Sequence, residues 1–451
     1  DDYLRYTENV PQFVLRELDA GIDVYVRTVR EHFGDQLLPQ QNTGTSIDIT
    51  PPGISKAVGV QALADAMGIG LIMPVLPTLL REFIASEDIA NHFGVLLALY
   101  ALMQVIFAPW LGKMSDRFGR RPVLLLSLIG ASLDYLLLAF SSALWMLYLG
   151  RLLSGITGAT GAVAASVIAD TTSASQRVKW FGWLGASFGL GLIAGPIIGG
   201  FAGEISPHSP FFIAALLNIV TFLVVMFWFR ETKNTRDNTD TEVGVETQSN
   251  SVYITLFKTM PILLIIYFSA QLIGQIPATV WVLFTENRFG WNSMMVGFSL
   301  AGLGLLHSVF QAFVAGRIAT KWGEKTAVLL GFIADSSAFA FLAFISEGWL
   351  VFPVLILLAG GGIALPALQG VMSIQTKSHQ QGALQGLLVS LTNATGVIGP
   401  LLFAVIYNHS LPIWDGWIWI IGLAFYCIII LLSMTFMLTP QAQGSKQETS
   451  A

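Results

Sequence analysis

The chain has 451 residues, of which 54% are hydrophobic and 11% are charged, and its formal net charge at pH 7 is −5. A mean hydropathy of +0.67 with so few charges excludes an ordinary soluble domain, in which roughly a quarter of the residues are charged. The single cysteine, Cys427, excludes a disulfide within the chain, and we expect no nucleic-acid partner.

The first 56 residues contain no apolar stretch long enough to cross a membrane, and they carry most of the negative charge. Apolar residues recur at helical spacing from Val10 to Phe33, which predicts an amphipathic helix. The stretch QQNTGTSIDITPPG, residues 40–53, is polar and rich in turn residues, which predicts a linker. We expect residues 1–56 to be a fusion-derived extension, with a natural soluble appendage as the alternative.

Apolar runs of about twenty residues follow, the length that an α-helix needs to cross the hydrocarbon core of a bilayer. They are apolar on every side, whereas the strands of a membrane barrel alternate polar and apolar residues. We place twelve spans, at residues 57–80, 92–112, 122–141, 144–169, 180–202, 210–229, 260–284, 294–315, 325–345, 349–374, 382–408 and 416–438. The predicted fold class is an all-α membrane protein with twelve transmembrane helices, embedded in a lipid bilayer.

The twelve spans divide into two related halves. The polar stretch at 230–257 predicts a cytoplasmic linker between bundles at 57–229 and 258–438, and residues 439–451 form a tail. GKMSDRFGRRPV from Gly112 returns as GRIATKWGEKTA from Gly316, and GPIIGG from Gly195 returns as GPLLFA from Gly399, both 204 residues later. Duplicated helical bundles are the usual plan of secondary transporters.

Lys and Arg residues indicate the orientation. If both termini are cytoplasmic, nearly all of the Lys and Arg residues outside the spans lie on the cytoplasmic side, and only Arg81 and Arg288 lie on the other side. The positive-inside rule therefore predicts a multi-pass protein with both termini in the cytoplasm.

The loop GKMSDRFGRRPV between the second and third spans is dense in charge. The positive-inside rule accounts for its basic residues, but it gives no reason for the acidic Asp116. Asp116 with Arg117, Arg120 and Arg121 is expected to form a cytoplasmic latch that holds one arrangement of the helices. A plain orientation signal is the alternative. Thr320 replaces Asp116 in the second half, so a latch there must be weaker or different.

The fifth span contains GLIAGPIIGG, residues 191–200. Small residues let the backbones of neighbouring helices approach closely, and proline bends a helix. We therefore expect a close-packed, kinked helix that can seal or rock at the seam between the halves, with ordinary glycine packing as the alternative. The residues concerned are Gly191, Gly195, Pro196, Gly199 and Gly200.

Ionisable side chains inside the spans are functional candidates, because a charge at the bilayer centre costs at least about 2.5 kcal/mol. For proton coupling our first choice is Asp335, a group that can hold a proton or a cation, with His307, which changes charge near neutral pH, and Asp65. Asp134 and Arg151 are expected to serve substrate binding or coupling. The alternatives are a satisfied structural pair for Asp335 and His307, an ion pair between Asp134 and Arg151, and a local hydrogen bond for Asp65.

Four glutamines in the spans, Gln104, Gln271, Gln275 and Gln311, are further candidates for substrate binding. Buried amides need hydrogen-bond partners, and His307 and Gln311 share one helix face because they are four residues apart. Hydrogen bonding between helices is an equally open explanation for these amides.

The two motifs also carry a family resemblance. GKMSDRFGRRPV resembles the loop signature of the major facilitator superfamily, and GLIAGPIIGG resembles the antiporter signature of its fifth helix. From Asp65 to the C-terminus, including DAMGIGLIMPVLPTLLREF, the chain closely resembles the class B tetracycline/metal-proton antiporters, which are bacterial drug-resistance pumps, whereas residues 1–64 do not. The resemblance implies a location in the bacterial inner membrane and assigns His307 and Asp335 to proton coupling.

The resemblance further implies export of tetracycline, chelated to a divalent cation such as Mg²⁺, in exchange for a proton. On that reading the metal arrives with the substrate and no cofactor is bound permanently, which agrees with the absence of a Cys or His cluster with metal-ligand spacing from the sequence. A proton-coupled multidrug exporter or symporter of the same fold is the alternative. We expect no enzyme activity, because the motifs of intramembrane aspartyl proteases are absent, and no G-x-x-x-x-G-K-[ST] motif for ATP occurs.

Overall fold

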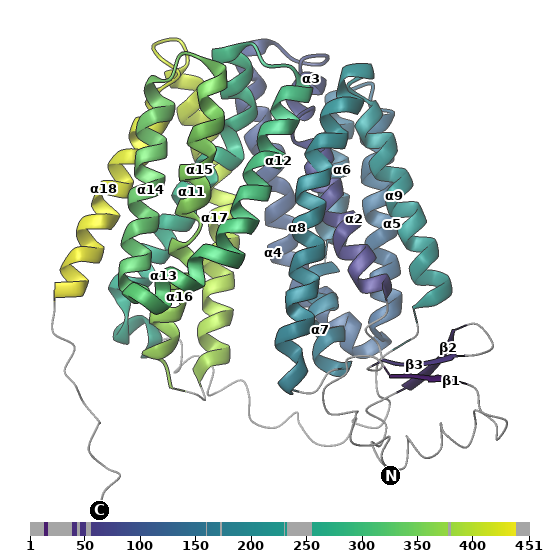
Figure 1. Cartoon of the computed structure of the whole chain (residues 1–451). Helices are drawn as coiled ribbons and strands as arrows, with labels where there is room; N and C mark the ends of the chain where they lie inside the picture. Colours follow the sequence, from purple (N-terminus) through teal and green to yellow (C-terminus); the bar gives the residue numbers. More distant parts are fainter. Residues whose placement is uncertain are drawn as a thin grey trace, which may run out of the picture.

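The computed structural model describes residues 13–16, 38–42, 46–50, 56–158, 160–171, 174–229, 231, 255–377 and 380–438. Long helices form two bundles that stand side by side, the first to the right and the second to the left in Figure 1. The first bundle contains α2 (Lys56–Ile72), α3 (Leu76–Leu80), α4 (Ile89–Phe118), α5 (Arg120–Ala139), α6 (Leu144–Thr157), α7 (Thr160–Thr171), α8 (Ala174–Ile205) and α9 (Ser209–Trp228). A 3₁₀ turn, η3 (Ser86–Asp88), precedes α4.

The second bundle repeats this plan. It contains α11 (Pro261–Phe289), α12 (Ser293–Val309), the π-helical turn η4 (Phe310–Ala315), α13 (Gly316–Trp322), α14 (Glu324–Phe344), the 3₁₀ turn η5 (Gly348–Leu350), α15 (Val351–Gly361), α16 (Ala364–Ile374), α17 (Gln381–Ser410) and α18 (Trp417–Leu438). The predicted linker lies outside the described residues except for Glu231 and residues 255–257, and so does the predicted tail.

Ten of the twelve predicted spans coincide with described helical segments that are long and apolar enough to cross a membrane. The first and fourth spans are each broken into two helices. The first is interrupted between α2 and α3, where Pro74 and Pro77 disfavour a continuous helix. The fourth is interrupted between α6 and α7 next to Gly158, a residue type that holds a helix weakly. The chain is therefore a multi-pass membrane protein with two discontinuous spans in its first half.

The duplication is visible in the positions of these helix boundaries. The α6–α7 break recurs 204 residues later as the break between α15 and α16. Gly119, between α4 and α5, has a φ of 103°, and its counterpart Gly323, between α13 and α14, has a φ of 84°. Glycine alone adopts such angles readily. The prediction of two related six-helix bundles is thus confirmed down to the conformation of equivalent turns.

The N-terminal extension differs from its prediction. β1 (Phe13–Arg16) and β2 (Leu38–Asn42) both pair antiparallel with β3 (Ser46–Thr50), in the order β1-β3-β2. The helix prediction is wrong for β1, and the linker prediction is wrong where β2 and β3 lie. The apolar and β-branched residues of β1 and β3 suit a pleated sheet, and a pairing between distant segments leaves no trace in helical periodicity. The remainder of the predicted helix lies outside the described residues.

The two bundles contact each other along two seams, α8 against α12 and α4 against α17. Near one end the seams are tight: a Cβ added at Gly200 would lie 2.7 Å from the Ser293 carbonyl oxygen. Midway, a Cβ at Gly189 would find only the Ser308 hydroxyl, at 3.8 Å, and further along a Cβ at Gly185 would meet no described atom within 4 Å. Space between the bundles therefore opens toward the end that carries the α4–α5 turn, which we call the basic end.

The seam between α4 and α17 diverges in the same direction. A Cβ at Gly94 would lie 2.5 Å from the Pro400 carbonyl oxygen, one at Gly396 would lie 3.9 Å from Ala101, and one at Gly112 would meet no described atom within 4 Å. Both seams therefore indicate that the space between the bundles widens toward the basic end.

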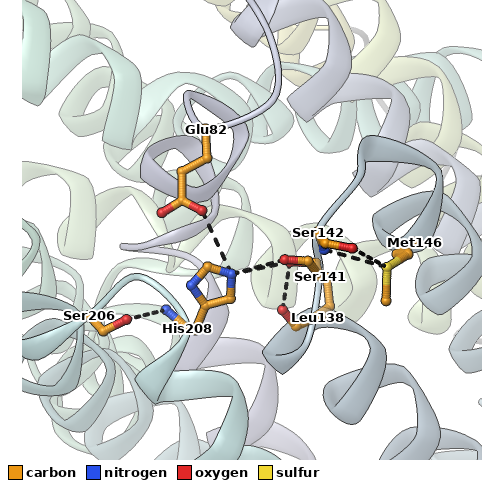
Figure 2. Close-up of polar contacts among 7 residues, drawn as sticks. All are labelled: Glu82, Leu138, Ser141, Ser142, Met146, Ser206 and His208. Carbon is orange, nitrogen blue, oxygen red and sulfur yellow. Dashed lines mark hydrogen bonds and ion pairs between the residues drawn. The ribbon is translucent and has the colours of Figure 1, made fainter.

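Polar contacts close the opposite end. The Arg81 guanidinium pairs with the Glu286 carboxylate of the second bundle at 2.6 Å. Figure 2 shows the neighbouring Glu82, which lies 3.7 Å from Nε2 of His208; the same nitrogen is 3.3 Å from the Ser141 carbonyl oxygen. Three connections of the first bundle therefore meet at His208, beside the ion pair that joins the bundles.

Candidate functional site

The first candidate cluster lies where α5 faces α6 and α4. Asp134 of α5 is fully buried and pairs with the guanidinium of Arg151 on α6, which is 8% exposed. The same guanidinium lies over the ring of Tyr100 on α4, 5.7 Å from the ring centroid. Gln104, one turn along α4, donates a hydrogen bond of 2.8 Å to the Tyr100 hydroxyl. The structure thus brings three of the predicted residues together around Tyr100.

The break between α6 and α7 contributes to this cluster. The Gln104 amide also donates to the carbonyl oxygen of Gly158, at 3.2 Å. Gly158 is the C-cap residue that follows α6, at a helix end where backbone carbonyls have no partner within the helix. Gly150 of α6 provides room for the carboxylate, because a Cβ there would lie 2.5 Å from Oδ1 of Asp134. Each glycine therefore has a structural role in the cluster: the carbonyl oxygen of Gly158 binds Gln104, and Gly150 leaves room for the Asp134 carboxylate.

Asp65 of α2 lies near the same cluster. It is half-buried, and it lies within electrostatic range of the hydroxyl groups of Tyr100 and Tyr135. The three residues that we predicted for proton coupling are therefore divided, with Asp65 in the first bundle and His307 and Asp335 in the second.

The second candidate cluster surrounds the break between α15 and α16. Asp335 of α14 occupies the space that a side chain at Gly361 would fill, and His307 of α12 occupies the space beside Gly362. Nε2 of His307 lies 2.9 Å from the Gln311 amide nitrogen. The prediction that His307 and Gln311 share a face is confirmed, and adjacent glycines place both ionisable side chains against one short segment.

Helix α12 is itself irregular at this point. It ends at Val309, two residues after His307, and continues as η4, a π-helical turn that contains Gln311. Single π-turns within α-helices occur frequently at functional sites. Two irregular segments, η4 and the α15–α16 break, therefore flank His307.

The two remaining glutamines, Gln271 and Gln275, make different contacts. The Gln271 amide donates to the Thr392 hydroxyl at 2.7 Å and to the Tyr267 hydroxyl at 3.0 Å, and Gln369 donates to the same tyrosine at 3.1 Å. This network joins α11, α16 and α17 within the second bundle. Gln275 instead packs against α17, where its side chain fills the space beside Gly399. Both glutamines thus have contacts that suit helix–helix packing, the alternative left open by the sequence.

At the basic end, two of the four predicted latch residues, Arg120 and Arg121, bind a carboxylate that sequence reasoning missed. The Asp116 carboxylate pairs with the Arg120 guanidinium at 2.5 Å. The Glu231 carboxylate accepts hydrogen bonds from the backbone N–H groups of Arg120, at 2.8 Å, and Arg121, at 3.1 Å. Arg117 lies beside the Phe118 ring. Because Glu231 follows α9, the chain leaving the first bundle is tied to the N-terminus of α5.

We expect Glu231→Gln to lower the free energy of unfolding by about 0.5–2 kcal/mol, because it removes a negative charge that accepts two N–H groups at a helix N-terminus. Thermal unfolding in detergent measures this change. Glu347→Gln is the matched control, since Glu347 is exposed and its side chain does not cap the turn that it precedes. Equal melting temperatures for the two variants would contradict the role of Glu231.

The glycines of the antiporter motif lie on α8 between α2 and α12. Gly191, Gly195 and Gly199 face α2: a Cβ at Gly191 would lie 2.5 Å from the Leu63 carbonyl oxygen, and one at Gly195 would lie 2.6 Å from that of Met67. Gly200 faces α12 at the seam, whereas Pro196 directs its carbonyl oxygen toward Gly297 of α12 and its ring toward Gly70 of α2. The expected close packing of this helix is confirmed.

The two ionisable clusters offer complementary chemistry. The first holds a cation and a carboxylate in contact, whereas in the second a carboxylate and an imidazole lie against adjacent glycines, and no arginine or lysine of the described residues is among their hydrogen-bond partners. Within the described ranges, no three His, Cys, Asp or Glu side chains lie close enough together to hold a metal ion.

Sequence reasoning missed Tyr100 and Tyr426 as partners. The contact of Tyr100 with Gln104 could have been predicted, since the two residues are four apart and so share one helix face. That of Tyr426 could not have been, because 91 residues separate this tyrosine from Asp335, to which its hydroxyl donates.

Comparison with known proteins agrees with this architecture. The model of the Major Facilitator Superfamily matches residues 58–382 and 263–451. The tetracycline resistance protein, class B, of Escherichia coli is 98% identical over 397 residues, which cover 88% of this chain and 99% of that protein. The class D protein of Salmonella ordonez is 61% identical over 375 residues, or 83% of this chain and 95% of its own length.

Among solved structures, the human organic anion transporter MFSD10 has the same fold, with a TM-score of 0.63 and 21% identity over 84% of this chain and 98% of its own. The family model matches most of the chain. The high identity to two tetracycline resistance proteins places the chain in one group within that family. This chain therefore belongs to the major facilitator superfamily, among its tetracycline resistance proteins.

Proposed function

We propose that this chain exports tetracycline, as a complex with a divalent cation, across the bacterial inner membrane in exchange for a proton, and thereby confers resistance to the drug. The observation that carries the proposal is the 98% identity to a tetracycline resistance protein over nearly the whole length of that relative. The buried ion pair in one bundle and the Asp335–His307 cluster in the other support it.

The orientation follows from the distribution of charge. Lys113, Arg117, Arg120 and Arg121 lie at or beside the α4–α5 turn, and such residues favour the cytoplasmic face. The basic end is then cytoplasmic, and the space between the bundles is open to the cytoplasm, from which an exporter takes its substrate.

Exchange requires that proton and substrate compete for one group. A carboxylate attracts a cationic drug–metal complex, and it loses that attraction when a proton neutralises it. Asp335 is our choice for this group, and His307, beside it at the α15–α16 break, is an imidazole that can change its charge near neutral pH. Asp134 and Arg151 in the first bundle would contact the substrate or transmit its binding.

The available energy is sufficient for uphill export. Exchanging one proton for a singly charged cationic complex moves no net charge, so the pH gradient drives it, and a tenfold proton gradient provides about 1.4 kcal/mol. One proton per cycle therefore sustains about a tenfold gradient of the complex for each pH unit across the membrane. In this scheme the divalent cation is part of the cargo and leaves with the drug.

Everted inner-membrane vesicles test the proposal directly. With an imposed pH gradient, acidic inside, the parent chain is expected to accumulate tetracycline only when Mg²⁺ is present. Asp335→Asn is expected to reduce that uptake more than tenfold, because the amide cannot bind and release the proton.

The control is Asp88→Asn, which alters an exposed carboxylate at the opposite end of the molecule and should transport like the parent. Uptake without Mg²⁺ would refute the chelate as the substrate. An Asp335→Asn variant as active as the parent would refute the coupling role, and uptake of unrelated drugs at equal rates would favour a multidrug exporter.

A further inference from the structure

The carboxylate of Asp335 has a specific hydrogen-bond donor. The Tyr426 hydroxyl on α18 donates to Oδ2 of Asp335 at 2.9 Å. On the other side, the carboxylate lies against Gly361, where any side chain would collide with it. The tyrosine and the glycine together define the position of the carboxylate on α14.

The ring of Tyr426 is fixed by packing rather than by this hydrogen bond. The residue is 4% exposed, and its ring meets that of Phe339 edge-on, 5.3 Å between centroids, and lies 6.1 Å from that of Phe332. The hydroxyl is therefore held in place before it donates, and a phenylalanine at this position would keep the ring contacts.

Few other groups around Asp335 can titrate. Of the elements packed against α14, α15 and α16 contain no ionisable side chain, and α18 contains only Tyr426 and Cys427. From α12, His307 lies against Gly362.

The charged residues nearest in sequence lie at the basic end of these helices. Glu324 and Lys325 begin α14, about 15 Å along the helix from Asp335, and Arg317 and Lys321 lie on α13, which ends just before them. The Tyr426 hydroxyl is thus the polar group in direct contact with the Asp335 carboxylate among the described residues.

We propose that Tyr426 is a positioning residue for the proton step at Asp335: its hydroxyl holds the carboxylate against Gly361 and stabilises its charged form. A donor to a carboxylate favours the charged form, and losing the donor favours the protonated form. This inference rests on the proposed function, in which Asp335 carries the exchanged proton.

The test is the pH dependence of Mg²⁺–tetracycline uptake by vesicles that contain Tyr426→Phe. We expect the pH at which uptake is half-maximal, on the acidic limb, to rise by about one unit or more, as for the loss of a hydrogen bond to a charged group. Tyr407→Phe is the matched control: Tyr407 is also buried, and its hydroxyl accepts a hydrogen bond from Asn287 at 3.2 Å. That variant should keep the parental profile.

A second measurement keeps the proposal testable without transport. Carbodiimides react with protonated carboxyl groups, so the pH dependence of Asp335 modification, followed by mass spectrometry, reports its protonation directly. Its midpoint should rise in Tyr426→Phe, and Asp335→Asn supplies the background.

An unchanged midpoint in both measurements would overturn the role of Tyr426. If Tyr426→Phe does not transport, the modification midpoint alone decides. If the parent chain itself does not transport, the proposed function fails, and the shift in modification between parent and Tyr426→Phe still decides whether the tyrosine positions Asp335.

Discussion

Replacing Arg151 by glutamine is expected to abolish transport and to lower the free energy of unfolding by roughly 3–5 kcal/mol, the range for breaking a buried ion pair on one side. Asp134 is fully buried and pairs with this guanidinium. The variant would leave a carboxylate away from water without its countercharge. Chemical unfolding in detergent measures the stability, and vesicle uptake measures the activity.

The double variant Asp134→Asn with Arg151→Gln separates the two interpretations of this pair. Replacing both charges by amides removes the unpaired charge, so most of the stability should return. If the pair serves substrate binding or coupling, uptake stays lost. Parental uptake by the double variant would show that the pair is structural, which is the alternative that the sequence left open.

Arg81→Gln is the control for Arg151→Gln, because it makes the same substitution in an ion pair that is more exposed to water. The Arg81 side chain is 38% exposed and that of Glu286 is 9% exposed, so only one end of this pair reaches water, and we expect a loss between the roughly 1 kcal/mol of exposed pairs and the roughly 3 kcal/mol of buried ones. Equal losses of stability in Arg81→Gln and Arg151→Gln would contradict the argument from burial.

Much of the fold could be predicted because its signals are local in the sequence. Apolar length defined the spans, and the repeat offset of 204 residues, taken from Gly112 and Gly316, also relates the α6–α7 break to the α15–α16 break. The glycines of α8 recur every four residues and so lie on one face of a helix, which is why their close packing could be predicted from spacing.

The partners of the ionisable residues could be predicted only in part. Asp134 and Arg151 were paired because few charges exist inside the spans. The contacts of Asp335 with Tyr426 and of Arg120 with Glu231 depend on how helices rotate against one another, over separations of 91 and 111 residues. One sequence without its structure contains no local signal for such contacts.

The helix predicted from Val10 to Phe33 failed in β1 for a related reason. Short apolar segments fit more than one periodicity, and β1 is defined by pairing with β3, in which Phe13 lies opposite Ile49. A partner more than thirty residues away decided the structure of this segment.

The packing of α8 against α2 leads to the second large effect. Gly195→Val is expected to lower the free energy of unfolding by at least about 1–3 kcal/mol, the usual effect of overpacking, and to abolish uptake. A Cβ at Gly195 would lie 2.6 Å from the Met67 carbonyl oxygen and 2.9 Å from Cα of Gly70. Both are backbone atoms, so the new side chain can be accommodated only if the two helices separate.

Gly185→Val provides the comparison within the same helix. A Cβ at Gly185 would meet no described atom within 4 Å, and exchanging glycine for valine changes the intrinsic helix preference equally at both positions. The difference between the two variants in unfolding and in vesicle uptake therefore measures the α2–α8 contact itself. If Gly195→Val were as stable and as active as Gly185→Val, close backbone packing would not be required for transport. A stable but inactive Gly195→Val would instead indicate that the contact is needed while the helices move.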